Sequence, residues 1–215
     1  MNLLKSALLP LNERFVGPLE RIAERTPLPL VFVLGNHSSG KSTFINYALK
    51  RRVQEAGVAP TDDSFTIISP GAKDADQDGP ALVGQPDWGF RTLSTFGPSL
   101  VHHVKLKVRS GLAFDDIIIV DSPGMIDSPT DSISYVGAGK GRKDRGYDFE
   151  AATRWFAEKA DVILLFFDPD KPGTTGETLS VLTNSLAGMD HKFLICLNKA
   201  DVFERTSDFA RTCEF

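Results

Sequence analysis

The feature that most constrains the fold of this chain is the stretch GNHSSGKS, which runs from Gly35 to Ser42. It fits the pattern G-x-x-x-x-G-K-[ST] without a mismatch, and the apolar run LPLVFVL comes directly before it. Residues from Lys41 to about Glu55 have the apolar spacing of a helix. A glycine-rich turn between a buried strand and a helix is typical of a phosphate-binding loop, and a turn that binds nothing is the weaker interpretation.

This loop predicts how a nucleotide would be held. Backbone N–H groups would point at phosphate oxygens, and the N-terminus of the following helix would add partial positive charge. Lys41 is predicted to reach the β- and γ-phosphates, and the hydroxyl of Ser42 is predicted to ligand Mg²⁺. The predicted nucleotide-binding residues of the loop are Gly35, Asn36, His37, Ser38, Ser39, Gly40, Lys41, Ser42 and Thr43.

A second motif, Asp121-Ser122-Pro123-Gly124, ends the apolar run DDIIIVD. A carboxylate at Asp121 can support Mg²⁺ through water, and a flexible N–H at Gly124 can sense the γ-phosphate. D-x-x-G alone is a common turn, so its value depends on the phosphate-binding loop upstream.

A third motif, Asn198-Lys199-Ala200-Asp201, closes the apolar run KFLICL. In guanine-nucleotide-binding domains, N-K-x-D reads the base because its carboxylate accepts hydrogen bonds from guanine N1 and the 2-amino group. Adenine offers no such pair of donors, so the motif favours GTP. With the three motifs in this order, we expect a nucleotide-dependent switch domain with Asn198, Lys199 and Asp201 at the base.

The threonine of the metal shell is predicted at Thr61, in the segment APTDDSFTII. Its hydroxyl would join the Mg²⁺ shell, and its carbonyl could orient the attacking water. A simple turn threonine is the alternative reading of Thr61. Thr66 competes for the role, but its place in an apolar run indicates a strand residue.

The group that orients water in Ras-like domains is missing. Those domains carry a glutamine just after D-x-x-G, whereas Met125 and Ile126 follow here. Hydrolysis would therefore use other groups, and Ser38 and His37 are the nearest polar candidates. Ser38 could seat the phosphates or a monovalent cation. His37 as a general base is the weaker hypothesis, because phosphoryl transfer needs positioning and charge stabilisation more than base catalysis.

Four basic residues follow D-x-x-G in a glycine-rich stretch, and we interpret them as a solvated segment. Contact with a partner or an anionic membrane is the alternative. They are Lys140, Arg142, Lys143 and Arg145.

The fold class follows from strands that alternate with helices along the chain. This order predicts an α/β P-loop NTPase with a mostly parallel sheet and helices on both faces. We expect a short N-terminal helical segment at residues 1–27 and a nucleotide-binding domain at residues 28–215. Residues 70–90 are predicted as a long loop, and residues 100–110 as a half-buried edge strand.

Composition narrows the function classes. A formal charge of −4 over 215 residues gives no support to nucleic-acid binding. Two cysteines suggest no disulfide framework, and no apolar run is long enough to span a bilayer. These features predict a cytoplasmic protein.

Several longer motifs resemble the dynamin superfamily, and most closely the EHD family with its sarcalumenin-like relatives. They include P-T-D-D-S-F at 60–65, F-R-T-L-S-T-F-G at 90–97, R-G-Y-D-F at 145–149 and W-F-A-E-K-A-D-V-I-L-L-F-F-D at 155–168. The resemblance implies nucleotide-driven self-association through the G domain and remodelling of membranes in trafficking. It favours Thr61 as the switch threonine.

The resemblance also qualifies two expectations. EHD proteins bind adenine nucleotides although they keep N-K-x-D, so ATP stands as the alternative to GTP. Family members continue with further elements beyond the equivalent of Asp201, so we interpret the chain as truncated at its C-terminus, and we expect poor solubility or association between domains.

The resemblance implies a peripheral location on endosomal or plasma membranes, with membrane contact through regions mostly absent from this chain. A nucleotide-gated scaffold with negligible hydrolysis is the competing hypothesis.

Overall fold

The computed structural model describes residues 26–55, 63–125, 145–169, 176–205, 207–208 and 210. The predicted helical segment at residues 1–27 therefore lies almost wholly outside the described residues. So do four residues singled out from the sequence, namely Thr61, Lys140, Arg142 and Lys143.

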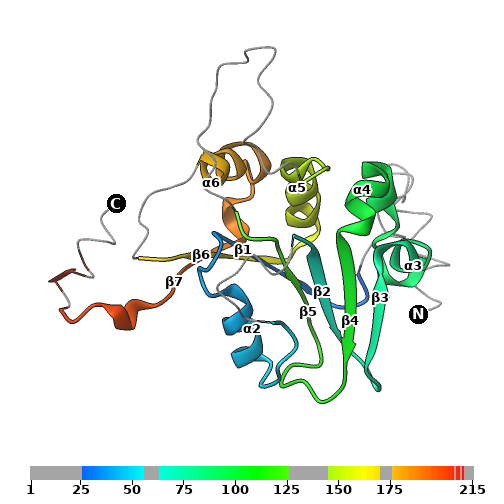
Figure 1. Cartoon of the computed structure of the whole chain (residues 1–215), viewed down its shortest axis with the longest axis horizontal. Coiled ribbons are helices and arrows are strands. Elements are labelled where there is room, and N and C mark those ends of the chain that lie inside the picture. Colours follow the sequence, from blue (N-terminus) through cyan, green and yellow to red (C-terminus); the bar gives the residue numbers. More distant parts are fainter. Residues whose placement is uncertain are drawn as a thin grey trace, which may run out of the picture.

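A single sheet of seven strands organises the described part of the chain, in the order β3-β4-β2-β5-β1-β6-β7 (Figure 1). β1 pairs in parallel with β5 and β6, β6 with β7, and β2 with β4, whereas β2–β5 and β3–β4 are antiparallel. The predicted mostly parallel sheet is confirmed. The strands are β1 (Leu30–Gly35), β2 (Phe65–Pro70), β3 (Ala75–Asp78), β4 (Val104–Arg109), β5 (Ile118–Asp121), β6 (Val162–Phe167) and β7 (Phe193–Leu197).

Helices cover both faces of this sheet, as predicted. α2 lies on one face, and α3, α4, α5 and α6 lie on the other (Figure 1). Among the described residues, no helix combines the length and apolar character that crossing a bilayer requires. The helices are α2 (Lys41–Ala48), α3 (Gly79–Val83), α4 (Gly97–His102), α5 (Phe149–Lys159) and α6 (Gly176–Ser180), with a π-helical turn η5 (Val181–Ser185) and the 3₁₀ turns η3 (Pro86–Trp88), η4 (Arg91–Phe96), η6 (Asp190–Lys192) and η7 (Ala200–Val202).

The core divides into two apolar clusters because side chains alternate between the faces of each strand. On β1, Phe32 belongs to the larger cluster, under α3–α5, and Val33 to the smaller one, under α2. Phe65 of β2 is fully buried in the larger cluster, and its ring centre lies 4.7 Å from that of Phe156 and 5.9 Å from that of Phe149. The aromatic rings of β2 and α5 thus fasten the helical layer to the sheet.

The direction of the strands gathers the three sequence motifs at one edge of the sheet. β1, β5, β6 and β7 run in the same direction, so their carboxyl ends meet. Gly35 ends β1, Asp121 ends β5, and Asn198 directly follows β7. Ligands of open α/β sheets bind at this edge.

Three sequence expectations differ from the structure. The helix predicted over residues 41–55 ends at Ala48. The predicted loop at residues 70–90 contains β3 and α3. β3 forms because it pairs with β4, and Asp78 caps α3 by accepting a hydrogen bond from Ala81 N at 3.0 Å. The predicted edge strand begins as α4 and continues as β4, which lies between β2 and β3, so β3 is the edge strand.

Replacing Phe65 should show how far this aromatic cluster stabilises the fold. We expect Phe65→Ala to lower the free energy of unfolding by about 3–5 kcal/mol, since it leaves a cavity between β2 and α5. Urea unfolding followed by far-UV circular dichroism measures this. Phe114→Ala is the control, because its side chain is 47% exposed and should cost about 1 kcal/mol or less. Equal losses in the two variants would contradict the packing described.

Candidate functional site

The phosphate-binding loop has a backbone that favours glycine at Gly40, the residue directly before α2. Gly40 precedes α2 with φ of 93°, in the left-handed region. A Cβ atom there would lie 2.1 Å from the side-chain nitrogen of Asn198. The close contact exists because Asn198 Nδ2 donates to the carbonyl of Ser39 at 2.9 Å. The loop that carries N-K-x-D is therefore bonded directly to the phosphate-binding loop.

Lys41 is buried at the start of α2, with its ammonium group turned back onto the loop. Its Nζ donates to the carbonyls of Gly35 at 2.8 Å and Asn36 at 3.0 Å. Burial lowers the pKa of Lys41 to about 8; the Asp121 carboxylate opposes this shift, and the nearby Arg145 adds to it. A buried cation at a helix N-terminus is an arrangement that an anionic ligand would stabilise.

Ser42 and Asp121 bring two oxygen ligands together beside Lys41. The hydroxyl of Ser42 donates to Asp121 Oδ2 at 3.1 Å. Among the described residues, no group of three or more histidine, cysteine or acidic side chains is placed so that it could hold a metal ion. Mg²⁺ commonly takes one or two protein oxygens and completes its shell with phosphate and water. The hydroxyl and carboxylate present here fit that ion.

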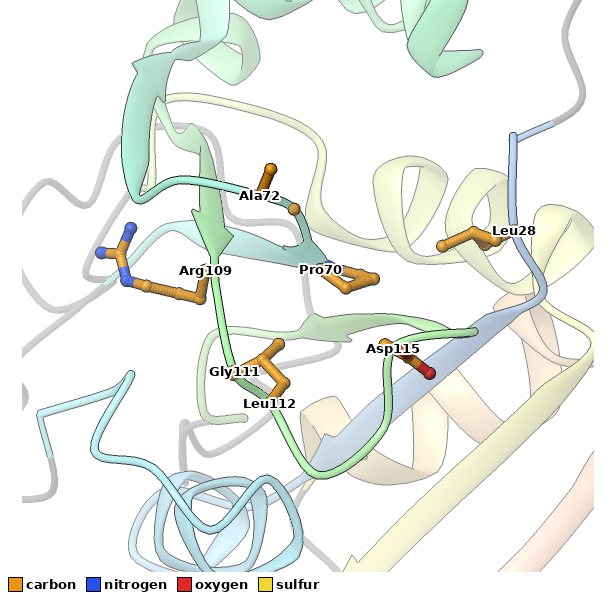
Figure 2. A pocket seen from close by; sticks show the side chains of 8 residues that line it. Leu28, Pro70, Ala72, Arg109, Gly111, Leu112 and Asp115 are labelled. Atoms are coloured by element: carbon orange, nitrogen blue, oxygen red, sulfur yellow. The ribbon is translucent and has the colours of Figure 1, made fainter.

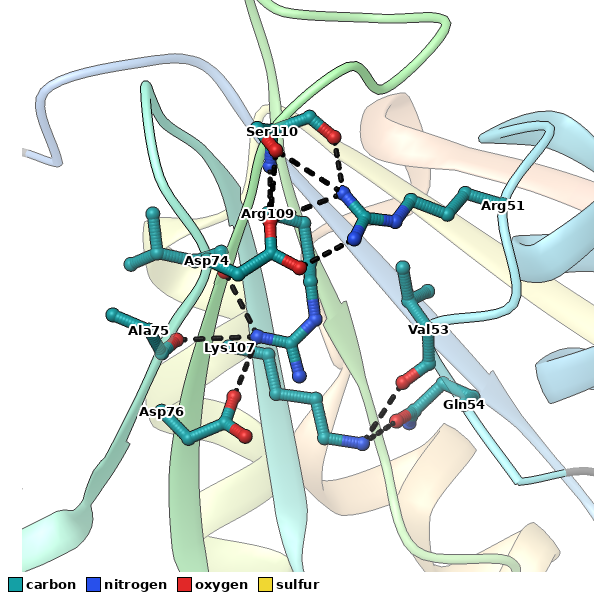
Figure 3. A network of polar contacts seen from close by, with 10 residues as sticks. Arg51, Val53, Gln54, Asp74, Ala75, Asp76, Lys107, Arg109 and Ser110 are labelled. Carbon is teal, nitrogen blue, oxygen red and sulfur yellow. Dashed lines mark hydrogen bonds and ion pairs between the residues drawn. The ribbon is translucent and has the colours of Figure 1, made fainter.

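Gln54 is a residue of this site that the sequence analysis missed. Its Nε2 donates to Asp121 Oδ2 at 2.7 Å, and its Oε1 accepts from Lys107 Nζ at 2.7 Å. Figure 3 shows Lys107 also reaching the carbonyl of Val53, at 2.9 Å. Asn46 of α2 fixes this turn, since its Oδ1 accepts from the backbone N–H groups of Val53 and Gln54 and its Nδ2 donates to the Gln54 carbonyl. A lone glutamine after a helix carries no motif that could have revealed it.

The D-x-x-G turn packs directly on the phosphate-binding loop. His37 N donates to the carbonyl of Met125 at 3.0 Å, and Met125 N donates to the carbonyl of Gly35 at 3.2 Å. A Cβ atom on Gly124 would lie 2.7 Å from the Cα atom of His37, so this position requires glycine. Movement of the turn is consequently coupled to the loop.

Arg145 is not solvated, so the interpretation of the four basic residues as a solvated segment is wrong for this one. Its side chain is only 5% exposed, and Nη2 donates to the carbonyl of Gly124 at 2.8 Å. It also forms an ion pair with Glu177 Oε2 at 3.2 Å. Burial against Gly124 brings Arg145 to the site, a placement that its polar, glycine-rich sequence context concealed.

The remaining predicted residues lie around this centre. Ser38 Oγ is 2.9 Å from His37 Nδ1, so the two polar candidates of the loop interact with each other. Lys199 Nζ lies 2.5 Å from Asp168 Oδ2, and Asp201 is exposed on η7. The structure describes further predicted or competing residues as follows: Thr43 is exposed on α2, Thr66 is a buried strand residue of β2 as expected, and Thr61 lies outside the described residues.

A separate polar network ties β3 to β4 at the opposite end of the sheet (Figure 3). Arg51 pairs with Asp74, and Arg109 Nη1 pairs with Asp76 Oδ1 at 2.6 Å. The hydrogen bond from Ser110 N and the Arg51 guanidinium hold the pKa of Asp74 well below its usual range. This network holds the residues that directly follow α2 against the antiparallel pair of strands β3 and β4.

A pocket of about 360 Å³ lies at this same end of the sheet (Figure 2). Its lining includes Leu28, just before β1, and Pro70, at the end of β2. Because β1 runs away from Leu28 toward the phosphate-binding loop, the pocket and the three motifs occupy opposite ends of the sheet. The pocket is therefore not the nucleotide site.

Comparison with known proteins identifies the same region of the chain as a GTPase-type domain. A family model described as 50S ribosome-binding GTPase matches residues 30–199. EH domain-containing protein 2 of Homo sapiens is 36% identical over 94% of this chain and 36% of its own length. EH domain-containing protein 1 of Arabidopsis thaliana is 35% identical over 87% of this chain and 33% of its own length. The chain thus spans about a third of the length of these curated relatives.

A solved structure shares the fold. It is one of an oligomerised bacterial dynamin pair, described as providing a mechanism for the long-range sensing and tethering of membranes. The TM-score is 0.58 at 16% sequence identity, over 99% of this chain and 33% of that one.

Replacing Gln54 should weaken the candidate metal site without unfolding the protein. We expect Gln54→Leu to raise the Mg²⁺ concentration needed for nucleotide binding by about 10-fold, because Asp121 loses a hydrogen bond that orients it. A Mg²⁺ titration with a fluorescent nucleotide measures this. Gln85→Leu makes the same chemical change at an exposed site, where the side chain only accepts from Trp88 Nε1. Unchanged Mg²⁺ dependence in Gln54→Leu would exclude the positioning role.

The buried ammonium of Lys41 should make stability depend on pH. Its folded-state pKa of about 8 lies below the ordinary 10.5, so the cost of burying the charge is fully present below pH 8. The unfolded state binds more protons between these values, and wild-type stability should therefore rise relative to Lys41→Met by about 3 kcal/mol across that range. Urea unfolding of nucleotide-free protein from about pH 7 to about pH 10 tests this. A difference that stays constant with pH would refute it.

Proposed function

Because this chain belongs to the GTPase family whose model it matches, and its domain is an EHD-like G domain of the dynamin superfamily, we propose that it binds and hydrolyses GTP with Mg²⁺. The chain is a nucleotide-binding protein of dynamin type. The observation that carries the proposal is the convergence of Ser42 and Asp121 beside the buried Lys41. A metal-binding pair next to a phosphate-binding cation is the minimum that phosphoryl transfer requires.

Each residue of the proposed site has one role. Lys41 bonds the β- and γ-phosphates, and Gly124 senses the γ-phosphate through its N–H group. Bound Mg²⁺ would neutralise phosphate charge, held by Ser42, Thr61 and, through water, Asp121. Ser38 and His37 contribute polar groups next to the phosphates. The backbone N–H groups from Asn36 to Thr43 complete the cradle.

The base is proposed to be guanine. Asn198 shapes the base site and joins it to the loop through Ser39. Lys199 is held by Asp168 and takes a φ of 57°, which orients the turn that leads to Asp201. The description of the matching family model as a GTPase supports the same choice. ATP is the alternative that the EHD resemblance implies.

We propose that nucleotide turnover is coupled to self-association through the G domain and to membrane remodelling. The likeness to EH domain-containing proteins and to an oligomerised, membrane-tethering bacterial dynamin pair supports this coupling. The same likeness is the ground for proposing a peripheral position at the cytoplasmic surface of endosomal or plasma membranes.

Phosphate release in the presence of Mg²⁺ and liposomes tests hydrolysis. We expect Lys41→Ala to lower the rate by at least about 100-fold, because a cation on the transferring phosphoryl group is lost. Lys73→Ala, at an exposed lysine, should keep the wild-type rate. Wild-type phosphate release no faster than that of Lys41→Ala would refute the proposed hydrolysis and favour the nucleotide-gated scaffold.

Competition between GTP and ATP for a fluorescent nucleotide tests the base. Asp201→Asn sharpens it, since an amide places an N–H donor against the guanine 2-amino group, whereas xanthine has a carbonyl there. We expect this variant to lose GTP affinity by about 10-fold or more and to gain affinity for xanthosine triphosphate. Tighter binding of ATP by the wild type would overturn the guanine assignment.

A further inference from the structure

Arg145 is a buried cation for which the proposed function has no role. Besides Gly124 and Glu177, its guanidinium contacts the ring of Phe149, with a distance of 4.2 Å from the Cζ atom to the ring centre. Nη2 makes the hydrogen bonds to both Gly124 and Glu177. The side chain also interacts with Tyr147: burial raises the pKa of that tyrosine, and the guanidinium opposes this larger effect by lowering it.

Nη1 of Arg145 is buried and has no hydrogen-bond partner among the described residues. A buried donor without an acceptor costs free energy, and one on a charged group costs more. Groups of this kind in a native structure point to a missing partner. For a guanidinium, the partner that fits best is a carboxylate or a phosphate oxygen.

Both anchors of Arg145 are attached to the phosphate-binding loop. Gly124 lies against the backbone of His37, as its lack of room for a Cβ atom shows. Glu177 is followed by Thr178, whose hydroxyl donates to Asn36 Oδ1 at 2.6 Å. The guanidinium is therefore fixed beside the loop residues Asn36 and His37. It is also close enough to Lys41 for like-charge repulsion to lower the pKa of that lysine.

We propose that Arg145 is an arginine supplied in cis, which bonds the terminal phosphate of the bound nucleoside triphosphate through Nη1 and stabilises charge during hydrolysis. This proposal rests on the proposed function. In that reaction a water oxygen bonds to the terminal phosphorus, and the bond from phosphorus to the oxygen it shares with the β-phosphate breaks. The electron pair stays on the diphosphate, and a proton of the water leaves with inorganic phosphate or solvent.

A cation at this position would supply rate enhancement where the water-orienting glutamine of Ras-like domains is missing. Met125 stands where Ras-like domains carry the water-orienting glutamine, and its side chain can neither donate nor accept a strong hydrogen bond. Charge stabilisation of the transferring phosphoryl group is an independent source of rate. Arg145 would supply this charge. Because Arg145 also bonds Gly124, the positive charge and the proposed γ-phosphate sensor would be positioned together.

The test compares Arg145→Gln and Arg145→Lys with the wild type. Arg109→Gln is the matched control, because Arg109 likewise donates to backbone carbonyls and pairs with an acid, Asp76, but lies at the opposite end of the sheet. Three quantities are measured for each variant: the single-turnover rate of GTP hydrolysis at saturation, the affinity for GDP, and the gain in affinity when aluminium fluoride is added to GDP as a mimic of the transferring phosphoryl group.

We expect Arg145→Gln to lower the single-turnover rate by at least about 100-fold and to abolish the gain from aluminium fluoride, with GDP affinity within about threefold of wild type. Arg145→Lys should fall between the two, since it keeps the charge and loses the planar fork. Arg109→Gln should leave all three quantities unchanged.

Two outcomes would overturn the proposal. In the first, Arg145→Gln keeps the wild-type gain from aluminium fluoride. In the second, it lowers GDP affinity by the same factor as the hydrolysis rate, which is the result of a purely structural residue. If the wild type binds GDP but does not hydrolyse GTP, the proposed hydrolysis fails, and the aluminium fluoride measurement still decides the role of Arg145.

Discussion

The parallel pairing of β1 with β5 is the constraint on which the rest of the site depends. The register places Val33 beside Asp121, so that β5 ends in a carboxylate next to the strand that leads into the phosphate-binding loop. Side chains alternate along a strand, and a slip of one residue would turn Asp121 to the other face of the sheet. The hydrogen bond between Asp121 and Ser42, and hence the proposed metal site, follows from strand pairing rather than from either motif alone.

The polar groups of the site are costly to bury, and most of their hydrogen bonds are made to neighbouring residues, with Nη1 of Arg145 as an exception among the described residues. Lys41 is bonded by carbonyls of its own loop, Asp121 by Ser42 and Gln54, and Arg145 by Gly124 and Glu177. Buried polar groups need such partners, because each unpaired one opposes folding. A lysine and an arginine buried beside one loop lower the free energy of unfolding of the nucleotide-free protein. A bound anion would restore part of that loss.

The sequence predicted what depends on local pattern and missed what depends on assembly. The phosphate-binding loop and its flanking strand and helix could be predicted because each is encoded in contiguous residues. The mostly parallel sheet could be predicted because strands alternate with helices along the chain. Gln54 and Arg145 could not, because their significance comes from contacts with Asp121 and Gly124, far away in the chain. The short α2 was missed because Asn46, a residue of ordinary helical sequence, bonds the next turn with its side chain and helps to end the helix early.

The hydrogen bond from Asn198 to the carbonyl of Ser39 has a consequence for selectivity. It joins the proposed base site to the backbone two residues before Lys41, so one continuous piece of structure would contact both ends of a bound nucleotide. A base that sits badly would strain the same backbone that aligns the phosphates. Selectivity between bases would then act at two stages, first in binding and again in the alignment of the reacting atoms. A wrong nucleotide that binds would still be a poor substrate.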